Sequence, residues 1–185
     1  MTTRWIVTAL GQDRPGIVAG VTKVLYQLGC NLEDSAMTRL ESEFAIMLIF
    51  SSATPFSLER LQHAFAPLER RLRLVVHLKA LTKSETSTPQ SRGRAYLISL
   101  YGADKPGIVF KVSDLLARCG ANVTDVHTHR SADGKSRTAR SLYLLLLEVE
   151  LAARVSLSTV EQRLKQLGKR LGVEVTVRPS EADVL

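Results

Sequence analysis

The sequence predicts an α+β protein built from two β-α-β-β-α-β units in tandem. Residues 11–39 and 102–130 align without a gap and are identical at 12 of 29 positions, where random pairing would give about two. Around each copy, strand-like and helix-like patterns follow one another in the same order. A stretch at 82–93, rich in Ser, Thr and Pro, lies between the halves. We therefore expect a first domain at 1–81, a linker at 82–93 and a second domain at 94–185.

The first half opens with a strand, a turn and a helix. Residues 4–10 (RWIVTAL) are rich in strand formers and predict the first strand. After the turn GQDRPG, apolar residues recur on one helical face. Asp13 is expected to cap this helix and Pro15 to lie in its first turn, while Gly29 ends it. The residues expected to face inward are Ile17, Val18, Val21, Val24, Leu25 and Leu28.

Three further strands and a second helix complete the first half. Strands are expected at 31–39 and 44–50, joined by a short polar turn. A helix follows, since Leu58, Leu61, Phe65, Leu68 and Leu72 form an apolar stripe. Pro67 lies inside this stripe, so a kink or a break is expected near Ala66. Residues 73–80 predict the closing strand.

The second half repeats this order. Its strands are expected at 94–101, 121–129, 142–151 and 173–177, and a longer polar hairpin with a tight turn at Asp133-Gly134 follows the second of them. The first helix should face inward with Ile108, Val109, Val112, Leu115, Leu116 and Cys119. The second should do so with Leu157, Val160, Leu164, Leu167 and Leu171.

This order corresponds to the ferredoxin-like arrangement, in which both helices cover one face of a four-stranded antiparallel sheet. The other face would be open, and an open face should alternate with polar residues. The strands at 44–50 and 142–151 do not alternate, so an apolar outer face is expected in both units. Such a face needs a cover. The sequence therefore predicts close pairing of the two units or a homodimer.

The chain is basic, with a formal net charge of +7 and a sequence pI near 9.7. Basic residues gather at 69–73, 92–94, 135–140 and 163–170. This charge permits a nucleic acid or an acidic protein as partner. Aromatic residues make up only 5% of the chain, and no nucleic-acid-binding motif accompanies the charge. A solvated or protein-facing basic surface is therefore favoured over direct nucleic-acid binding.

Location and redox state follow from what the chain contains. No apolar run approaches the roughly 20 residues of a membrane span, and the start MTTRWIVTAL is a poor signal peptide. Cys30 and Cys119 stand opposite Ala121 and Leu28 in the repeat, so a repeated disulfide framework is not expected. Reduced thiols in a cytoplasmic protein, without a membrane segment, are the expectation.

Polar groups and glycines coincide in both repeats only where the first strand turns into the first helix. A helix N-terminus offers free N–H groups and a positive dipole end, which suit a carboxylate. Gly16 and Gly107 would let a ligand approach the backbone. Asp13 and Asp104 could accept an ammonium group, unless they only cap their helices. With Asn31 and Asn122 just past the helix, these groups suit a small free amino acid.

The paired motifs D-[RK]-P-G-[IV]-V and G-x-N-[LV] resemble the ACT domain, twice, over nearly the whole chain. ACT domains are regulatory modules that commonly bind amino acids at an interface between two such domains. A chain of two ACT domains alone is similar to the glycine cleavage system transcriptional repressor family, which is thought to contact a separate DNA-binding activator in response to glycine. The positions implied by this resemblance are Asp13, Arg14, Pro15, Gly16, Ile17 and Asn31, with Asp104, Lys105, Pro106, Gly107, Ile108 and Asn122.

Other activities find less support in the residues. His127 and His129 share one face of a predicted strand, but no third metal ligand stands at metal-site spacing, so ordinary strand histidines are favoured. A phosphate-binding glycine loop with Lys, HExxH, CxxC and a nucleophile elbow are all missing. A similar turn occurs in formyltetrahydrofolate deformylases, whose catalytic domain has no counterpart here. The sequence predicts no enzyme, no metal and no cofactor.

Two hypotheses remain at this stage. The first is a non-catalytic cytoplasmic regulator that senses glycine or a similar small amino acid and controls a DNA-binding activator by protein contact. The second is a basic adaptor that binds nucleic acid or an acidic protein without a metabolite. The two halves also differ, since Arg14 in the first corresponds to Lys105 in the second and the second has the longer hairpin. It is therefore open whether both sites bind a ligand or only one.

Overall fold

The computed structural model describes residues 3–82, 93–131 and 142–180, and the chain forms two compact units, Met1–Thr88 and Pro89–Leu185. The first unit contains β1 (Thr3–Gln12), α1 (Ile17–Gln27), β2 (Asn31–Leu40), β3 (Glu43–Ser52), α2 (Leu58–Leu72) and β4 (Val75–Leu81). The second contains β5 (Gly93–Ala103), α4 (Ile108–Arg118), β6 (Ala121–Ser131), β7 (Leu142–Ala152), α5 (Leu157–Leu171) and β8 (Val173–Pro179). The predicted hairpin turn at Asp133-Gly134 lies outside the described residues.

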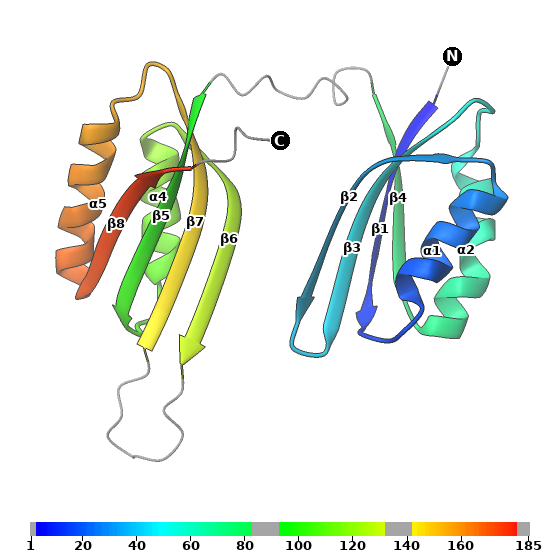
Figure 1. Cartoon of the computed structure of the whole chain (residues 1–185), viewed down its shortest axis with the longest axis horizontal. Helices are drawn as coiled ribbons and strands as arrows, with labels where there is room; N and C mark the ends of the chain where they lie inside the picture. The colour runs from blue at the N-terminus through cyan, green and yellow to red at the C-terminus, as the bar shows by residue number, and fades with distance from the viewer. Residues whose placement is uncertain (1–2, 83–92, 132–141, 181–185) are drawn as a thin grey trace. The chain divides into compact units, whose positions relative to one another are not determined.

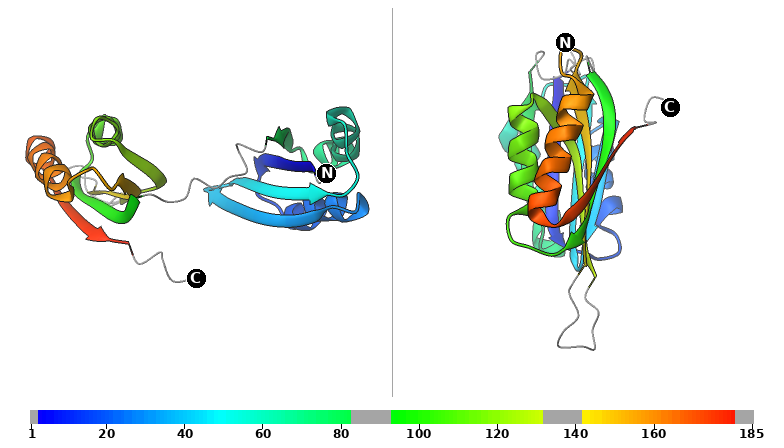
Figure 2. Two further views of the ribbon diagram at one scale, coloured as in Figure 1. Left: turned by 90° about the horizontal axis from the view of Figure 1, so that it is seen from above. Right: turned by 90° about the vertical axis from the view of Figure 1, so that its left-hand side faces the viewer.

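Each unit holds one four-stranded antiparallel sheet, in the order β2-β3-β1-β4 and β6-β7-β5-β8. Both helices of a unit lie on the same face of its sheet, as Figure 1 shows. The views of Figure 2 show the same two layers from above and from the side. The predicted α+β class and the ferredoxin-like arrangement of each unit are therefore confirmed.

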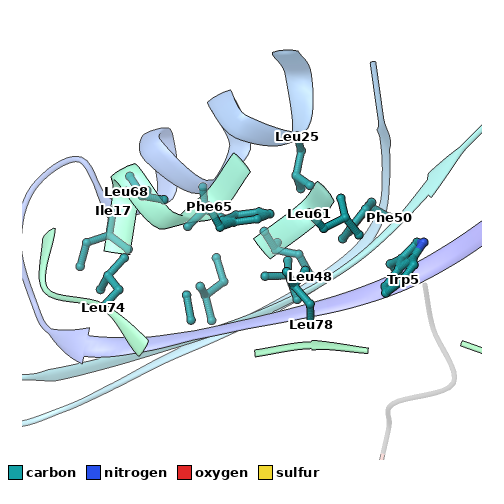
Figure 3. Close-up of a cluster of buried hydrophobic side chains, with 14 of the residues drawn as sticks. Trp5, Ile17, Leu25, Leu48, Phe50, Leu61, Phe65, Leu68, Leu74 and Leu78 are labelled. Carbon is teal, nitrogen blue, oxygen red and sulfur yellow. The ribbon is translucent and has the colours of Figure 1, made fainter. Parts of the chain in front are cut away.

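The core of the first unit fills the space between its helices and its sheet. Figure 3 shows Phe65 and Leu61 of α2, with Ile17 and Leu25 of α1, directed toward the sheet side chains. Phe50, Phe65 and Leu61 have no exposed surface. Burying a large apolar side chain stabilises the fold by about 1.5–3 kcal/mol, so these contacts hold the helices against the sheet.

The second unit has an equivalent and separate core. Its largest fully buried side chains are Ile98, Leu100, Ile108, Leu116, Leu145, Leu147 and Leu164. The expected inward faces are confirmed with three exceptions. Val18 is 41% exposed, Leu58 is 42% exposed and Val109 is 36% exposed. Val18 and Val109 each follow a buried isoleucine and therefore lie about 100° around the helix from it, at the edge of the buried face.

One helix detail differs from the sequence-based expectation, and another differs between the two units. The expected break near Ala66 is wrong, since α2 continues through Pro67 to Leu72. Pro67 is exposed, so its ring points away from the core. The positions that end the second helices also differ. Arg73 adopts a left-handed conformation with φ 54°, while its counterpart Gly172 has φ 72°.

The outer faces of β3 and β7 differ in polarity. In β3 the outward positions include Ala45 and Met47, and Met47 is 49% exposed. In β7 the outward series passes through Leu144 and Leu146 to Glu148 and Glu150, which are half-buried. The prediction of a fully apolar outer face is therefore wrong for the second unit. The charged half of that face can remain in water without a cover.

The cysteines lie partly buried in their units, and the helices are short or polar. Cys30 and Cys119 are free thiols, and each packs partly buried against the core of its own unit. Burial raises the pKa of the Cys30 thiol above its ordinary value. In the described part of the chain, every helix is too short or too polar to cross a membrane.

Candidate functional site

The turn between the first strand and the first helix has the same backbone in both units. Gly16 stands immediately before α1 with φ 92° and ψ 1°, and Gly107 stands before α4 with φ 85° and ψ 9°. Neither helix start has a side-chain cap. The expectation that Asp13 caps α1 is wrong, and Pro15 precedes the helix instead of lying in its first turn. A left-handed residue at this position separates Asp13 from the helix amides.

The first amides of both helices carry no intrahelical bond. The ladder begins with the Gly20 amide donating to the Gly16 carbonyl at 2.8 Å, and with the Lys111 amide donating to the Gly107 carbonyl at 3.0 Å. The three N–H groups before each donor precede the ladder. The side chains of Ile17 and Ile108 are only 2% exposed. These isoleucines anchor the helix start in the core and leave the backbone outside.

The space beside both turn glycines is open. A Cβ placed on Gly16 would meet no heavy atom within 4 Å, and one on Gly107 would meet only Lys111 Cε at 3.9 Å. Glycine is therefore needed here for its backbone conformation and not for space. Neither helix start is walled off by its own unit, so a small molecule could reach the amides.

The carboxylate of the turn forms the same ion pair in both units. Asp13 Oδ2 lies 3.3 Å from Arg39 Nη1, and Asp104 Oδ2 lies 3.0 Å from Arg130 Nε. Each arginine comes from the end of the second strand, so the pair ties the turn to that strand. The Asp13 amide also donates to the Ser42 carbonyl at 2.7 Å. A carboxylate has about four acceptor positions, so the aspartate can still accept another donor.

Arg39 and Arg130 are functional candidates that the sequence reasoning did not single out. They are identical residues at the last position of the aligned repeats. Their identity in the repeat could have indicated a shared role. The contact with the aspartate was not predicted, because each arginine is far from the turn along the chain and comes near it only when the second strand folds back.

The basic residue of the turn has a different contact in each unit. Arg14 Nη2 donates to Gln12 Oε1 at 2.8 Å, within the same turn. Lys105 Nζ donates to the Leu171 carbonyl at 2.6 Å, at the C-terminal end of α5. A cation at this end of a helix is favourable because it meets the negative pole of the dipole. The geometry therefore gives Lys105 a structural contact that Arg14 does not have.

The two asparagines lie at the other end of their units. Asn31 pairs with Ser51 of β3, whereas Gln12 beside the turn pairs with Glu43. The eight residues that separate these points along β3 correspond to about 26 Å. Asn122 pairs with Glu150, likewise remote from the turn. Within one unit the asparagine and the turn therefore form two separate groups.

The histidines and the surface hollows lie apart from the turns. His127 Nε2 lies 2.8 Å from Asp125 Oδ2 on β6. In the described ranges, no three His, Cys, Asp or Glu side chains gather in a metal-binding cluster. The main hollows lined by described residues lie between the two helices of each unit and beside Gly93, and Gly16 and Gly107 line none of these. A ligand at the turn would therefore lie on an open surface of its unit.

Comparisons with known proteins agree with this geometry. The glycine cleavage system transcriptional repressor of Escherichia coli (strain K12) is 25% identical over 179 residues, which cover 95% of this chain and 87% of that protein. A UPF0237 protein of Methanopyrus kandleri is 44% identical over 61 residues, covering 32% of this chain and 68% of that protein. The similarity to the glycine cleavage repressors expected from the turn motifs is thus confirmed.

Solved structures share the fold over the whole chain. A protein of unknown function from Galdieria sulphuraria gives a TM-score of 0.80 at 24% identity, covering 97% of this chain and 99% of that one. A candidate glycine cleavage system transcriptional repressor gives a TM-score of 0.67 at 20% identity, covering 96% of this chain and 97% of that one. The ACT domain model matches residues 3–81 and 94–178. The chain therefore belongs to the ACT domain family and contains two such domains.

Proposed function

We propose that this protein is a non-catalytic cytoplasmic regulator that senses glycine or a similarly small amino acid and controls a DNA-binding transcription factor by protein contact. The observation that carries the proposal is the pair of open, uncapped helix starts at Gly16 and Gly107. Each offers free amides and a positive dipole end to a carboxylate. The aspartate of the same turn offers oxygens to an ammonium group.

The comparisons support a regulatory role. ACT domains generally bind amino acids, and the similar Escherichia coli protein is a repressor of transcription. The similarity runs over 95% of the chain, so it includes both turns. This supports a protein that acts through its pair of ACT domains.

We expect a bound ligand to need a further protein surface over it. A single turn is open to solvent, and the asparagine of the same unit lies at the opposite end of the sheet. Exposed hydrogen bonds contribute little to affinity because water competes for the same groups. A surface that excludes this water would couple ligand binding to protein association.

Calorimetry with glycine, alanine, serine, acetate and methylamine tests the proposal. We expect glycine to bind, and acetate and methylamine to bind much more weakly, because each carries only one of the two charged ends. A Gly16→Ala, Gly107→Ala double variant should reduce glycine affinity at least tenfold, since an alanine at these dihedral angles costs about 1–2 kcal/mol and moves the amides.

Gly29→Ala with Gly120→Ala is the matched control. These glycines also have positive φ, of 66° and 74°, and stand at the other end of the same helices. Both double variants should lose similar stability, but only the first should lose glycine binding. If both double variants lost glycine binding equally, the loss would come from folding, and the proposed site would be contradicted.

The second hypothesis, a basic adaptor without a metabolite, gives the opposite result. In that case none of the five compounds binds at millimolar concentration, while binding to a macromolecule weakens steeply with salt. Melting curves with and without glycine at two salt concentrations separate the two hypotheses.

A further inference from the structure

Both domains carry a groove between their two helices, on the side away from the sheet. In the second domain it is lined by Lys111, Asp114, Leu115, Arg118, Arg163, Leu167 and Arg170, with a volume of about 290 Å³. We name it the α4–α5 groove. In the first domain a groove of the same volume is lined by Gly20, Lys23, Val24, Gln27, Ala64, Pro67, Leu68 and Arg71. Seven of these positions correspond in the repeat, so the groove belongs to the fold and its lining varies.

The α4–α5 groove is markedly basic. Four of its seven lining residues are Lys or Arg, against one Asp, whereas the groove of the first domain holds two cations. Lys111, Arg118, Arg163 and Arg170 are all exposed. Arg118 pairs with Asp114 at 2.8 Å. Lys111 and Arg170 have no ionic or hydrogen-bonded partner among the described residues, and Arg163 contacts only Cys119 Sγ at 3.6 Å.

The floor of this groove is apolar. Leu115 is half-buried, and Leu167 is 7% exposed and belongs to the core of the domain. The cations line the rim along α4 from Lys111 to Arg118, a distance of about 10 Å at 1.5 Å per residue. An apolar stripe flanked by charge, two helical turns long, matches the anchor spacing of an amphipathic helix docked in a groove.

The apolar floor favours a protein over a nucleic acid as the occupant. Asp114 already pairs with Arg118, so Lys111, Arg163 and Arg170 are the rim cations that remain for a partner. The leucines of the floor would be buried by apolar anchors but not by a phosphate backbone. Carboxylates of an acidic helix could pair with the exposed rim cations while its apolar face covers the leucines.

We propose that the α4–α5 groove docks an acidic amphipathic helix of a partner protein. This inference rests on the part of the proposed function in which the chain acts by protein contact, and it is independent of amino-acid binding. The charged rim would mainly accelerate encounter and select the partner, and the apolar floor would retain it.

The probe is a labelled 14-residue amphipathic peptide with leucines at helical spacing and glutamates on both flanks, added to the full-length protein. Fluorescence anisotropy should show saturable binding that weakens with salt, and amide shifts in NMR spectra should map to α4 and α5. The Arg163→Glu, Arg170→Glu variant should bind about tenfold more weakly or worse, because two attractive rim contacts become repulsive.

Lys165→Glu with Lys169→Glu is the matched control, since both residues lie on α5 but do not line the groove. It makes the same change in net charge and should leave affinity within about twofold. Equal weakening by both variants, shifts that map elsewhere, or tighter binding of a 20-base-pair duplex that depends on Arg163 and Arg170 would each overturn the proposal. Unchanged circular dichroism excludes misfolding. Glycine binding measured on the same variants separates this result from the sensor function.

Discussion

At the scale of single residues, the glycines of the turn serve two distinct physical requirements. Gly16 and Gly107 are needed for a left-handed backbone in open space. Gly102 is needed because the chain beyond α5 approaches it closely. A Cβ there would lie 2.8 Å from the Gly172 carbonyl oxygen and 2.9 Å from Val173 Cα. The glycines of one turn therefore meet different physical requirements.

Gly102→Ala is expected to destabilise the second domain by about 3 kcal/mol, since two backbone segments must move apart. Gly11→Ala should cost about 1–2 kcal/mol, because a Cβ there would meet one backbone atom, the Arg73 carbonyl oxygen at 3.0 Å, and the end of the Leu74 side chain at 2.9 Å. Urea denaturation followed by circular dichroism measures both. A larger loss for Gly11→Ala would contradict this ranking.

The contact of Asp13 could not be predicted from the residues around it. The pattern of Asp13 before a helical stripe is typical of a cap, but one left-handed glycine redirected the chain, and Asp13 pairs with Arg39 instead. A local pattern cannot reveal a partner 26 residues away. The aligned repeat could have, because the same pair recurs as Asp104 and Arg130. The ligand-binding roles of the turn residues remain a prediction.

At the scale of secondary-structure elements, helix order and sheet topology followed from periodicity, while strand ends did not. β1 extends to Gln12 and β5 to Ala103, beyond the predicted limits. Their final residues pair with β3 and β7 through backbone hydrogen bonds, which depend little on residue type. Pro67 illustrates the reverse error. Its local preference against a helix interior is outweighed by the buried Phe65 and Leu68 on either side.

The end of α2 provides a test at this scale. Arg73 holds a left-handed conformation that costs a side-chain-bearing residue about 1–2 kcal/mol, and its counterpart at the end of α5 is Gly172. Arg73→Gly should therefore stabilise the first domain by about 0.5–1 kcal/mol after the entropy cost of glycine. Thermal unfolding monitored at 222 nm measures the change, with Gly172→Ala expected to lower stability. If Arg73→Gly lowered the stability of the first domain, the arginine side chain would be shown to stabilise the end of α2.

At the scale of the whole molecule, the two domains have separate cores and separate sheets. Among the described residues, each core cluster consists of side chains of its own unit. The repeat in the sequence predicted this division, and the family match over 3–81 and 94–178 agrees with it. The prediction of an apolar outer face gave weight to the leucines of 142–147 and too little to Glu148 and Glu150, which alternate onto the same face of β7.

Independent cores predict independent folding. Fragments 1–88 and 89–185 correspond to the two compact units. Each should give a cooperative unfolding transition and the circular dichroism of an α+β domain. Domains of this size bury roughly 60% or more of the surface that their unfolded chains expose, which is marginal but sufficient. A fragment that is unfolded alone and folds on addition of the other would show that the domains depend on each other.

The duplicated Asp–Arg pair makes the two turns separable by mutation. Because each domain carries its own pair, a substitution at Asp13 or Arg39 leaves the pair of Asp104 and Arg130 intact. The two copies already differ in one contact, since Arg14 donates to Gln12 within its own turn and Lys105 donates to the end of a distant helix.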